Sequence, residues 1–97
     1  MNHRLEALRR MKKEIYRIAA KHNAEKVYVF GSCARKEDTP ESDIDLLVEF
    51  NSAATLFDQL DIRDEVRSLL SCKVDVVSKR GLHPYLRNRV LAEAVEL

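Results

Sequence analysis

The sequence predicts one domain of the α/β (or α+β) class, a mixed sheet of three strands flanked by helices. Its 97 residues suit a single domain with one core. Hydrophobic residues make up 45% of the chain, with two Gly and two Pro, which excludes disordered and fibrous classes. Apolar spacing alternates between helical and extended periods, in the order α-β-(short α)-β-α-β-α.

The first helix is predicted to run from residue 5 to about residue 22. Apolar side chains recur there every three or four positions among charged ones. They are Leu5, Leu8, Met11, Ile15, Ile18 and Ala19. The β-branched and aromatic run over 27–30 is typical of a buried strand that ends at Gly31. Residues 33–36 are expected to form a helical turn that begins at Ser32, followed by a polar loop.

The second strand is predicted over residues 43–50, where the side chains alternate between two faces. One face carries Ile44, Leu46, Val48 and Phe50, and the other carries Asp43, Asp45, Leu47 and Glu49. Thr55 then caps a long helix that ends near Leu70. A third strand is expected over 73–77, and Pro84 opens the last helix.

Charge and composition narrow the possible functions. The chain has 17 Lys and Arg residues and 16 Asp and Glu residues, so its net charge is +1. A charge this small argues against nucleic-acid binding through bulk positive charge. No apolar run approaches the roughly 20 residues of a membrane span. The polar N-terminus shows no signal peptide, and Cys33 and Cys72 form neither a disulfide framework nor a metal-ligand pair. We therefore expect a cytoplasmic protein without membrane or direct nucleic-acid contacts.

Asp43 and Asp45 are the first candidates for chemistry. On a strand they point to the same side, about 6.6 Å apart, and repel by about 2.5 kcal/mol at an effective dielectric constant near 20. An isolated pair of this kind is more often a solvated strand end. Here, however, the pair opens a strand whose remainder, over 46–48, is apolar on both faces. Carboxylates in that position favour a divalent cation such as Mg²⁺.

Asp75 is the third acidic candidate, because it interrupts an otherwise apolar strand. A structural alternative is a strand-end Asp neutralised by Lys73 on the same face. Three Asp from two strands can instead converge on two metal ions roughly 3.5–4 Å apart, the arrangement used for phosphoryl and nucleotidyl transfer.

Gly31 and Ser32 complement the acidic residues. A Gly directly after a strand lets the backbone approach a ligand, and a Ser that opens a helical turn presents hydroxyl and N–H groups to a phosphate. By itself this dipeptide is a simple turn. A Walker P-loop is excluded, because its Gly-x-x-x-x-Gly-Lys-Ser/Thr pattern is absent.

The combined pattern resembles the nucleotidyltransferase superfamily, which includes DNA polymerase beta and aminoglycoside nucleotidyltransferases. It is most similar to the minimal nucleotidyltransferases, the MntA-like antitoxins. Residues 31–35 and 42–48 match the two parts of the family pattern. The first part is Gly-Ser-x-Ala-Arg-Gly, and the second, after a spacer, is Ser-Asp-Ile-Asp-Leu-Leu-Val. Lys36 departs from the first part, because the family usually has Gly there. The resemblance implies a polymerase beta palm-like fold over one domain, residues 1–97.

The resemblance also implies roles for individual residues. Asp43, Asp45 and Asp75 would hold two Mg²⁺ ions, and Asp75 would also help deprotonate the attacking hydroxyl. Gly31 and Ser32 would bind the β- and γ-phosphates of ATP. Arg35 would face the phosphates, or it would instead form an ion pair at the surface, and the sequence favours neither role.

The function implied by the resemblance is that of an antitoxin enzyme. Minimal nucleotidyltransferases transfer AMP from ATP to a tyrosine of a HEPN-domain toxin, so a hetero-oligomer with that toxin is expected. A short domain with a triphosphate site has little room to grip an acceptor, which agrees with an acceptor that brings its own surface. Two alternatives remain open: a non-catalytic module that neutralises the partner by occlusion, and a small-molecule nucleotidyltransferase.

Overall fold

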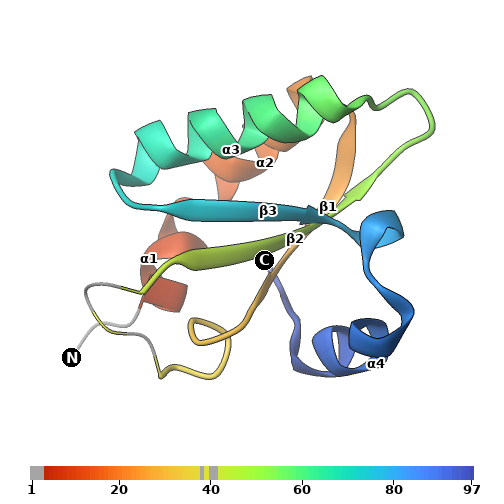
Figure 1. Ribbon diagram of the computed structural model, residues 1–97. Helices are drawn as coiled ribbons and strands as arrows, with labels where there is room; N and C mark the ends of the chain where they lie inside the picture. The colour runs from red at the N-terminus through yellow and green to blue at the C-terminus, as the bar shows by residue number, and fades with distance from the viewer. Residues whose placement is uncertain (1–3, 38, 40–41) are drawn as a thin grey trace.

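The structure, a computed structural model, describes residues 4–37, 39 and 42–97 and contains a four-stranded mixed sheet (Figure 1). The predicted mixed α/β class is confirmed, but the predicted number of strands, three, is wrong. The elements in chain order are α1 (Arg4–Arg10), α2 (Lys12–Lys21), β1 (Ala24–Phe30), β2 (Ile44–Phe50), α3 (Leu56–Leu70), β3 (Val74–Ser78), the 3₁₀ turn η1 (Lys79–Gly81), α4 (Pro84–Glu93) and β4 (Val95–Glu96).

The strand order is β3-β2-β1-β4. β1 is antiparallel to both β2 and β4, whereas β2 and β3 are parallel and connected through α3. A parallel pair needs a crossover of this kind, and a helix supplies it. The strand that the sequence did not predict, β4, pairs with Tyr28 and Val29 of β1. It has only two residues, too few to show an alternating pattern.

Helices lie on both sides of the sheet. α2 and α3 lie side by side over one face, and α4 lies on the other side (Figure 1). No residue of α4 is buried, in contrast to α1, α2 and α3. No helix in the described part of the chain is long and apolar enough to cross a membrane.

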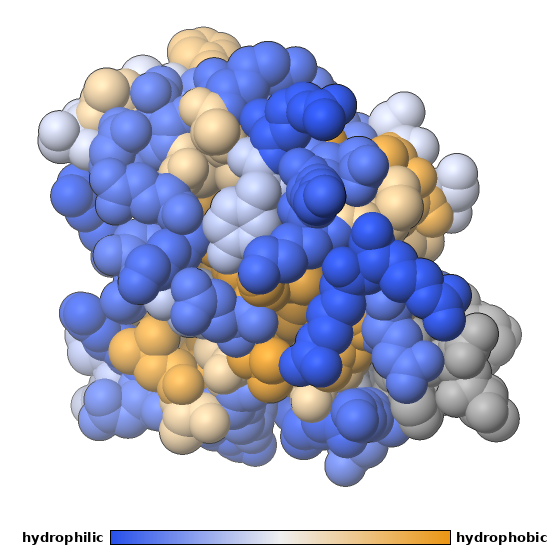
Figure 2. Space-filling view, turned by 180° about the vertical axis from the view of Figure 1, so that it is seen from behind, coloured by the Kyte–Doolittle hydropathy of each residue, from blue (hydrophilic) through white to orange (hydrophobic). Residues whose placement is uncertain are grey.

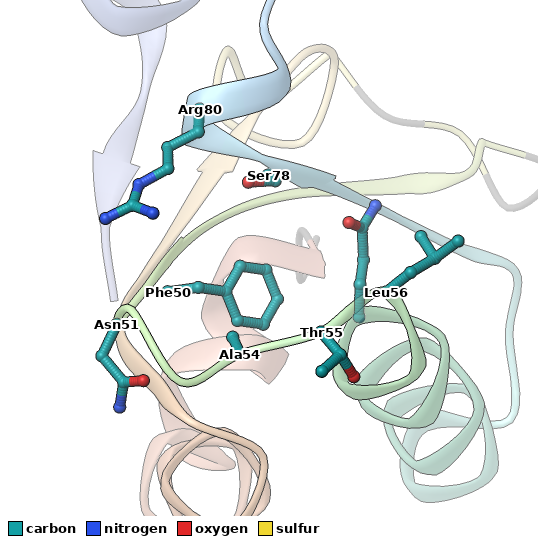
Figure 3. A pocket seen from close by; sticks show the side chains of 8 residues that line it. Phe50, Asn51, Ala54, Thr55, Leu56, Ser78 and Arg80 are labelled. Carbon is teal, nitrogen blue, oxygen red and sulfur yellow. The ribbon is translucent and has the colours of Figure 1, made fainter.

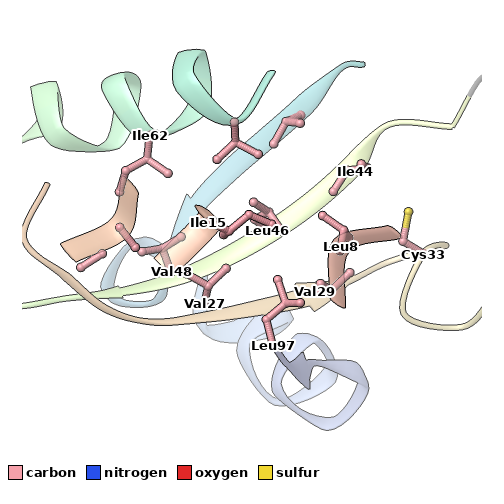
Figure 4. Packing of buried hydrophobic residues seen from close by; sticks show 14 of the residues in the cluster. Leu8, Ile15, Val27, Val29, Cys33, Ile44, Leu46, Val48, Ile62 and Leu97 are labelled. Atoms are coloured by element: carbon pink, nitrogen blue, oxygen red, sulfur yellow. The ribbon is translucent and has the colours of Figure 1, made fainter. Parts of the chain in front are cut away.

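The core lies between the sheet and the helices α1, α2 and α3 (Figure 4). Leu46 and Val48 of β2 are fully buried there, which confirms the predicted inward face of this strand. Leu47 is also fully buried, although it points to the opposite face. Burying each of these side chains contributes about 1.5–3 kcal/mol. β2 is therefore the best-anchored strand of the sheet, and it fixes the position of the acidic residues at its start.

Two details of the predicted helices are settled by the structure. The single helix expected over residues 5–22 is divided at Met11, whose backbone (φ −96°, ψ 13°) leaves helical geometry. Met11 N–H still reaches the carbonyls of Ala7 and Leu8, at 3.2 and 3.1 Å, so the division is a bend. Thr55 caps α3 as predicted, and its N–H donates to the Asp58 carboxylate at 2.9 Å.

The outer surface is mostly hydrophilic. Figure 2 shows the molecule from behind, where hydrophobic side chains gather only in patches between hydrophilic ones. The exposed large apolar side chains lie on two helices, Leu56, Phe57 and Leu60 on α3, and Tyr85 and Leu86 on α4.

Leu46→Ala tests the role of β2 as anchor. Truncation of this fully buried side chain leaves a cavity, so the free energy of unfolding should fall by about 2–5 kcal/mol, measured by urea denaturation. Leu56→Ala is the matched control, because Leu56 is 68% exposed and its loss should change stability by less than about 0.5 kcal/mol. Equal losses in both variants would contradict the assignment of the core.

Candidate active site

The predicted acidic and glycine positions come together at one end of the sheet. Because β1 is antiparallel to β2, and β2 is parallel to β3, the end of β1 meets the beginnings of β2 and β3. Phe30 is the register partner of Asp45, and Asp45 is the register partner of Asp75. Gly31 follows directly after Phe30. The topology thus brings together Gly31 and Asp45, which are 14 positions apart in the chain, and Asp45 and Asp75, which are 30 positions apart.

Asp43, Asp45 and Asp75 form a cluster of negative charge. Register partners on neighbouring strands point to the same face, with their strands about 4.8 Å apart. Asp45 is half-buried, whereas Asp43 and Asp75 are exposed. Burial raises the pKa of Asp45 above its ordinary value, and the charges of Asp75 and Asp43 raise it further. The neighbouring carboxylates therefore act on Asp45 as like charges, and they favour a cation at this edge.

The position of Gly31 has no room for a side chain, because the Asp45 carboxylate lies beside it. A Cβ placed on Gly31 would lie 2.5 Å from Asp45 Oδ2, closer than real Cβ atoms approach another atom. The backbone of Gly31 also has φ +73°, a left-handed conformation that favours glycine. The turn after β1 consequently lies directly against the carboxylate, which places the predicted phosphate-binding residues next to the predicted metal ligands.

The segment after Gly31 is a single helical turn closed at Lys36. Arg35 N–H donates to the Gly31 carbonyl at 3.2 Å, Lys36 N–H to Cys33 at 3.2 Å and Glu37 N–H to Ser32 at 2.9 Å. Lys36 has φ +59°, and this bond pattern is that of a Schellman motif. The helical turn expected over residues 33–36 is thus present as one hydrogen-bonded turn and not as a longer helix. Gly is the residue best suited to its closing position, where this chain has Lys36.

Arg35 connects the turn to the C-terminal helix. Its Nε lies 3.0 Å from Glu37 Oε2, and its Nη1 lies 3.0 Å from Glu93 Oε2 of α4. Both contacts raise the pKa of Arg35, the hydrogen bond to Glu37 most. Of the two alternatives predicted for Arg35, the structure shows the surface ion pair. The positive charge of Arg35 also offsets part of the rise in the pKa of Asp45.

Asp75 has a different cationic neighbour from the one the sequence suggested. Arg67 Nη2 of α3 lies 3.9 Å from Asp75 Oδ1, and Arg67 Nε donates to the Val74 carbonyl at 3.0 Å. Sequence reasoning missed both Arg67 and Glu93. Each belongs to a helix that reaches the site only through the tertiary fold, and no local pattern marks either of them.

The fit of a metal ion can be judged from the donors. Within the described ranges, no three Asp, Glu, His or Cys side chains are close enough together to enclose a metal. The cluster is therefore an open edge of carboxylate oxygens and not a closed cage. Mg²⁺ suits such an edge, because it is usually held by one or two carboxylates, substrate phosphates and water. The mutual repulsion at Asp45 also fits a bound cation.

Comparison with known proteins identifies the family of this chain. Residues 8–97 match the nucleotidyltransferase domain family. A Methanocaldococcus jannaschii protein named "Putative protein adenylyltransferase" is 39% identical over 87 residues, which cover 90% of this chain and 94% of that protein. The "Protein adenylyltransferase MntA" of Thermococcus cleftensis is 36% identical over 67 residues, 69% of this chain and 68% of that protein.

Solved structures share the fold. A protein described as a "putative minimal nucleotidyltransferase" is 45% identical and superposes with a TM-score of 0.86 over 96% of this chain and 95% of that one. A toxin–antitoxin structure with AMP-PNP is 21% identical, with a TM-score of 0.75 over 88% of this chain and 70% of that one. At that identity the likeness concerns the fold alone.

Gly31→Ala tests the close approach. The added methyl group has no room beside Asp45 Oδ2 and disfavours φ +73°, so we expect a loss of about 1–2 kcal/mol or more in stability and weaker ATP binding. Gly81→Ala is the control, because its Cβ would meet nothing nearer than Ser78 Cβ at 3.9 Å. Urea denaturation and ATP titration measure both effects. Equal behaviour of the two variants would refute the steric argument.

Lys36→Gly tests the closing position of the turn. Removing the side chain relieves the left-handed strain, so the free energy of unfolding should rise by about 1 kcal/mol in thermal or urea denaturation. Lys36→Ala keeps the strain but removes the charge, so it should bring no such gain. A gain of the same size in both variants would show that charge, and not backbone conformation, decides the stability here.

Proposed function

This chain belongs to the nucleotidyltransferase domain family, and we propose that it is a protein adenylyltransferase that transfers AMP from ATP to a tyrosine hydroxyl of a HEPN-domain toxin. The observation that carries the proposal is the juxtaposition of Gly31 with Asp45, and of Asp45 with Asp75. If the turn binds phosphate and the carboxylates bind metal, as we propose, both would act on one triphosphate, and this proximity supports the proposal. The names of the similar proteins support adenylyl transfer to a protein.

Nucleotide binding is proposed to use the turn and the carboxylates together. Gly31 and Ser32 would bind the β- and γ-phosphates, since the first N–H groups of a helical turn have no partner within it. Asp43, Asp45 and Asp75 would hold two Mg²⁺ ions. When bound, Mg²⁺ supplies positive charge against the triphosphate and the acidic cluster. Arg35 stands at the same turn and would add a further positive charge near the phosphates.

The transfer step is proposed to use Asp75 as proton acceptor. This carboxylate is 57% exposed, so an acceptor hydroxyl can reach it. The hydroxyl oxygen attacks the α-phosphorus of ATP, and its proton passes to Asp75. The bond from the α-phosphorus to the oxygen that bridges to the β-phosphorus breaks, and pyrophosphate leaves. Most of the catalysis would come from positioning and charge stabilisation.

A protein acceptor agrees with the surface of this chain. Phe57 of α3 is 76% exposed and Tyr85 of α4 is 90% exposed, with Leu56 and Leu86 beside them in the sequence. Exposed apolar side chains that cluster on helices are typical of protein contacts. We propose that they contribute to a hetero-oligomer with the toxin.

The test is the intact mass of a HEPN-domain toxin from the same genome after incubation with this protein, ATP and Mg²⁺. The toxin should gain one or more AMP units. Asp43→Asn and Asp45→Asn should each lower the rate by about a hundredfold or more, because each removes a charged ligand at the reacting phosphates. Chelation of Mg²⁺ should have the same effect.

The matched control is Asp64→Asn, which alters an exposed carboxylate paired with Arg63 on α3, outside the candidate site. It should transfer AMP at the normal rate. Full labelling by Asp45→Asn would overturn the assignment of the metal site. An unmodified toxin that still binds tightly would instead favour neutralisation by occlusion.

A further inference from the structure

The strand β3 forms the longer free edge of the sheet. The order β3-β2-β1-β4 gives β3 and β4 a neighbouring strand on one side only, within the part of the chain that the structure describes. β4 has two residues, whereas β3 has five, and three of these are valines. An edge strand of this kind presents backbone N–H and C=O groups to which a strand of another molecule can bond. We call the side of β3 that faces away from β2 the outer edge.

The backbone groups on the outer edge can be identified from the ladder between β2 and β3. The N–H of Ile44 donates to the Lys73 carbonyl at 3.0 Å, so that carbonyl faces β2. Backbone groups of successive residues in a strand point to opposite sides, so every second residue faces β2. The carbonyls of Val74 and Val76 therefore lie on the outer edge. The N–H groups of Val76 and Ser78 lie there as well.

Side chains of α3 occupy both of these outer carbonyls. Arg67 Nε donates to the Val74 carbonyl at 3.0 Å, and Gln59 Nε2 donates to the Val76 carbonyl at 2.9 Å. Both hydrogen bonds are partly buried. A strand that paired with β3 would need the same two carbonyls as acceptors. It could bond to them only by displacing Arg67 and Gln59.

Arg67 also fills the space that a neighbouring strand would occupy. Val74 belongs to the core, on the face of the sheet that α3 covers, whereas Asp75 points to the opposite face. Arg67 starts on α3, and yet its Nη2 lies 3.9 Å from Asp75 Oδ1. The guanidinium consequently crosses the outer edge from one face to the other. A paired strand would lie about 4.8 Å from β3, in the same space.

The other end of the outer edge opens on a cavity. Gln59 and Ser78 both line this cavity, which has a volume of about 270 Å³, and Leu56 of α3 lines it as well (Figure 3). Leu56 is 68% exposed. The edge near Ser78 is therefore accessible, and Gln59 is the side chain that bonds to the strand there.

A second copy of this chain is the occupant that fits the outer edge. Antiparallel pairing about a two-fold axis at Val76 sets this residue opposite its own counterpart. Val74 then lies opposite Ser78 of the second copy. Asp75 lies opposite Val77 of the second copy, so the two Asp75 carboxylates do not face each other, as like charges directly opposite would be destabilising. Because such a contact uses the same edge on both copies, it closes at a dimer.

We propose that the outer edge of β3 is a pairing surface for β3 of a second copy, and that Gln59 and Arg67 keep this surface closed. The two side chains satisfy the outer carbonyls within one molecule, so the chain does not pair there. Asp75 lies on the same strand, and the closed edge keeps a second copy away from it. The proposal concerns the fold and does not rest on the proposed function.

The first experiment removes both donors in the full chain with the double variant Gln59→Leu and Arg67→Leu. Light scattering should give it twice the molecular mass of the wild type at the same protein concentration, and each single variant should associate more weakly than the double variant. A denaturation curve shows that the variants are folded. An unchanged mass in the double variant, or aggregates without a defined size, would overturn the proposal.

Arg63→Leu is the matched control for this experiment. It removes the same charge and adds the same apolar side chain to α3, but Arg63 pairs with its neighbour Asp64. Its mass should equal that of the wild type. Association of this variant to the same extent would show that added apolar surface, and not an open edge, causes the dimer.

Amide hydrogen exchange locates the interface. In the wild type the N–H groups of Val76 and Ser78 should exchange at least tenfold faster than that of Val77, which faces β2. In the double variant they should become protected by a factor of ten or more. Protection of Val76 and Ser78 in the wild type, or a dimer without protection of them, would contradict pairing through the outer edge.

Ser78→Pro, added to the double variant, provides an independent test of the same interface. Proline removes an N–H of the outer edge without touching the ladder to β2, and the φ of Ser78, −77°, already suits it. The mass should return to that of the wild type. A dimer that persists with Ser78→Pro would place the contact elsewhere on the molecule.

Discussion

The candidate site depends on the contact between Gly31 and Asp45 across the antiparallel pair β1 and β2. A Cβ at Gly31 would lie 2.5 Å from the Asp45 carboxylate, so the chain reverses there with its backbone against a charged group. The contact sets where the turn to Lys36 begins, and this turn holds Arg35 where it pairs with Glu93 of α4. A residue larger than Gly would separate the two halves of the site.

The acidic cluster is tolerated because the rest of β2 is so well buried. Leu46, Leu47 and Val48 are fully buried and together contribute about 4.5–9 kcal/mol, which exceeds the repulsion of about 2.5 kcal/mol between Asp43 and Asp45. The strand can therefore hold Asp45 half-buried beside Asp75 without losing its register. Because the fold already holds the carboxylates near one another, their side chains lose less conformational entropy when a ligand binds.

Much of this arrangement could be predicted from local patterns, and the remainder could not. The alternation along β2, the Thr55 cap and the opening of α4 at Pro84 are set by neighbouring residues, and they were confirmed. The strand β4 was missed because two residues show no period, and the bend at Met11 leaves the apolar spacing unchanged. The contacts of Arg35 with Glu93 and of Arg67 with Asp75 join distant segments. The family resemblance supplied the roles of the acidic residues, which the strand pattern alone left open.

The face of the sheet that carries Asp45 and Glu49 has opposite charges at its two ends. The carboxylates of Asp43, Asp45 and Asp75 occupy the end where β2 and β3 begin, and the guanidinium groups of Arg80 and Arg87 occupy the other. Glu49 and Lys79 form a compensated pair beside these arginines. A polyanionic ligand is repelled by the first end unless cations accompany it, whereas the second end attracts it directly.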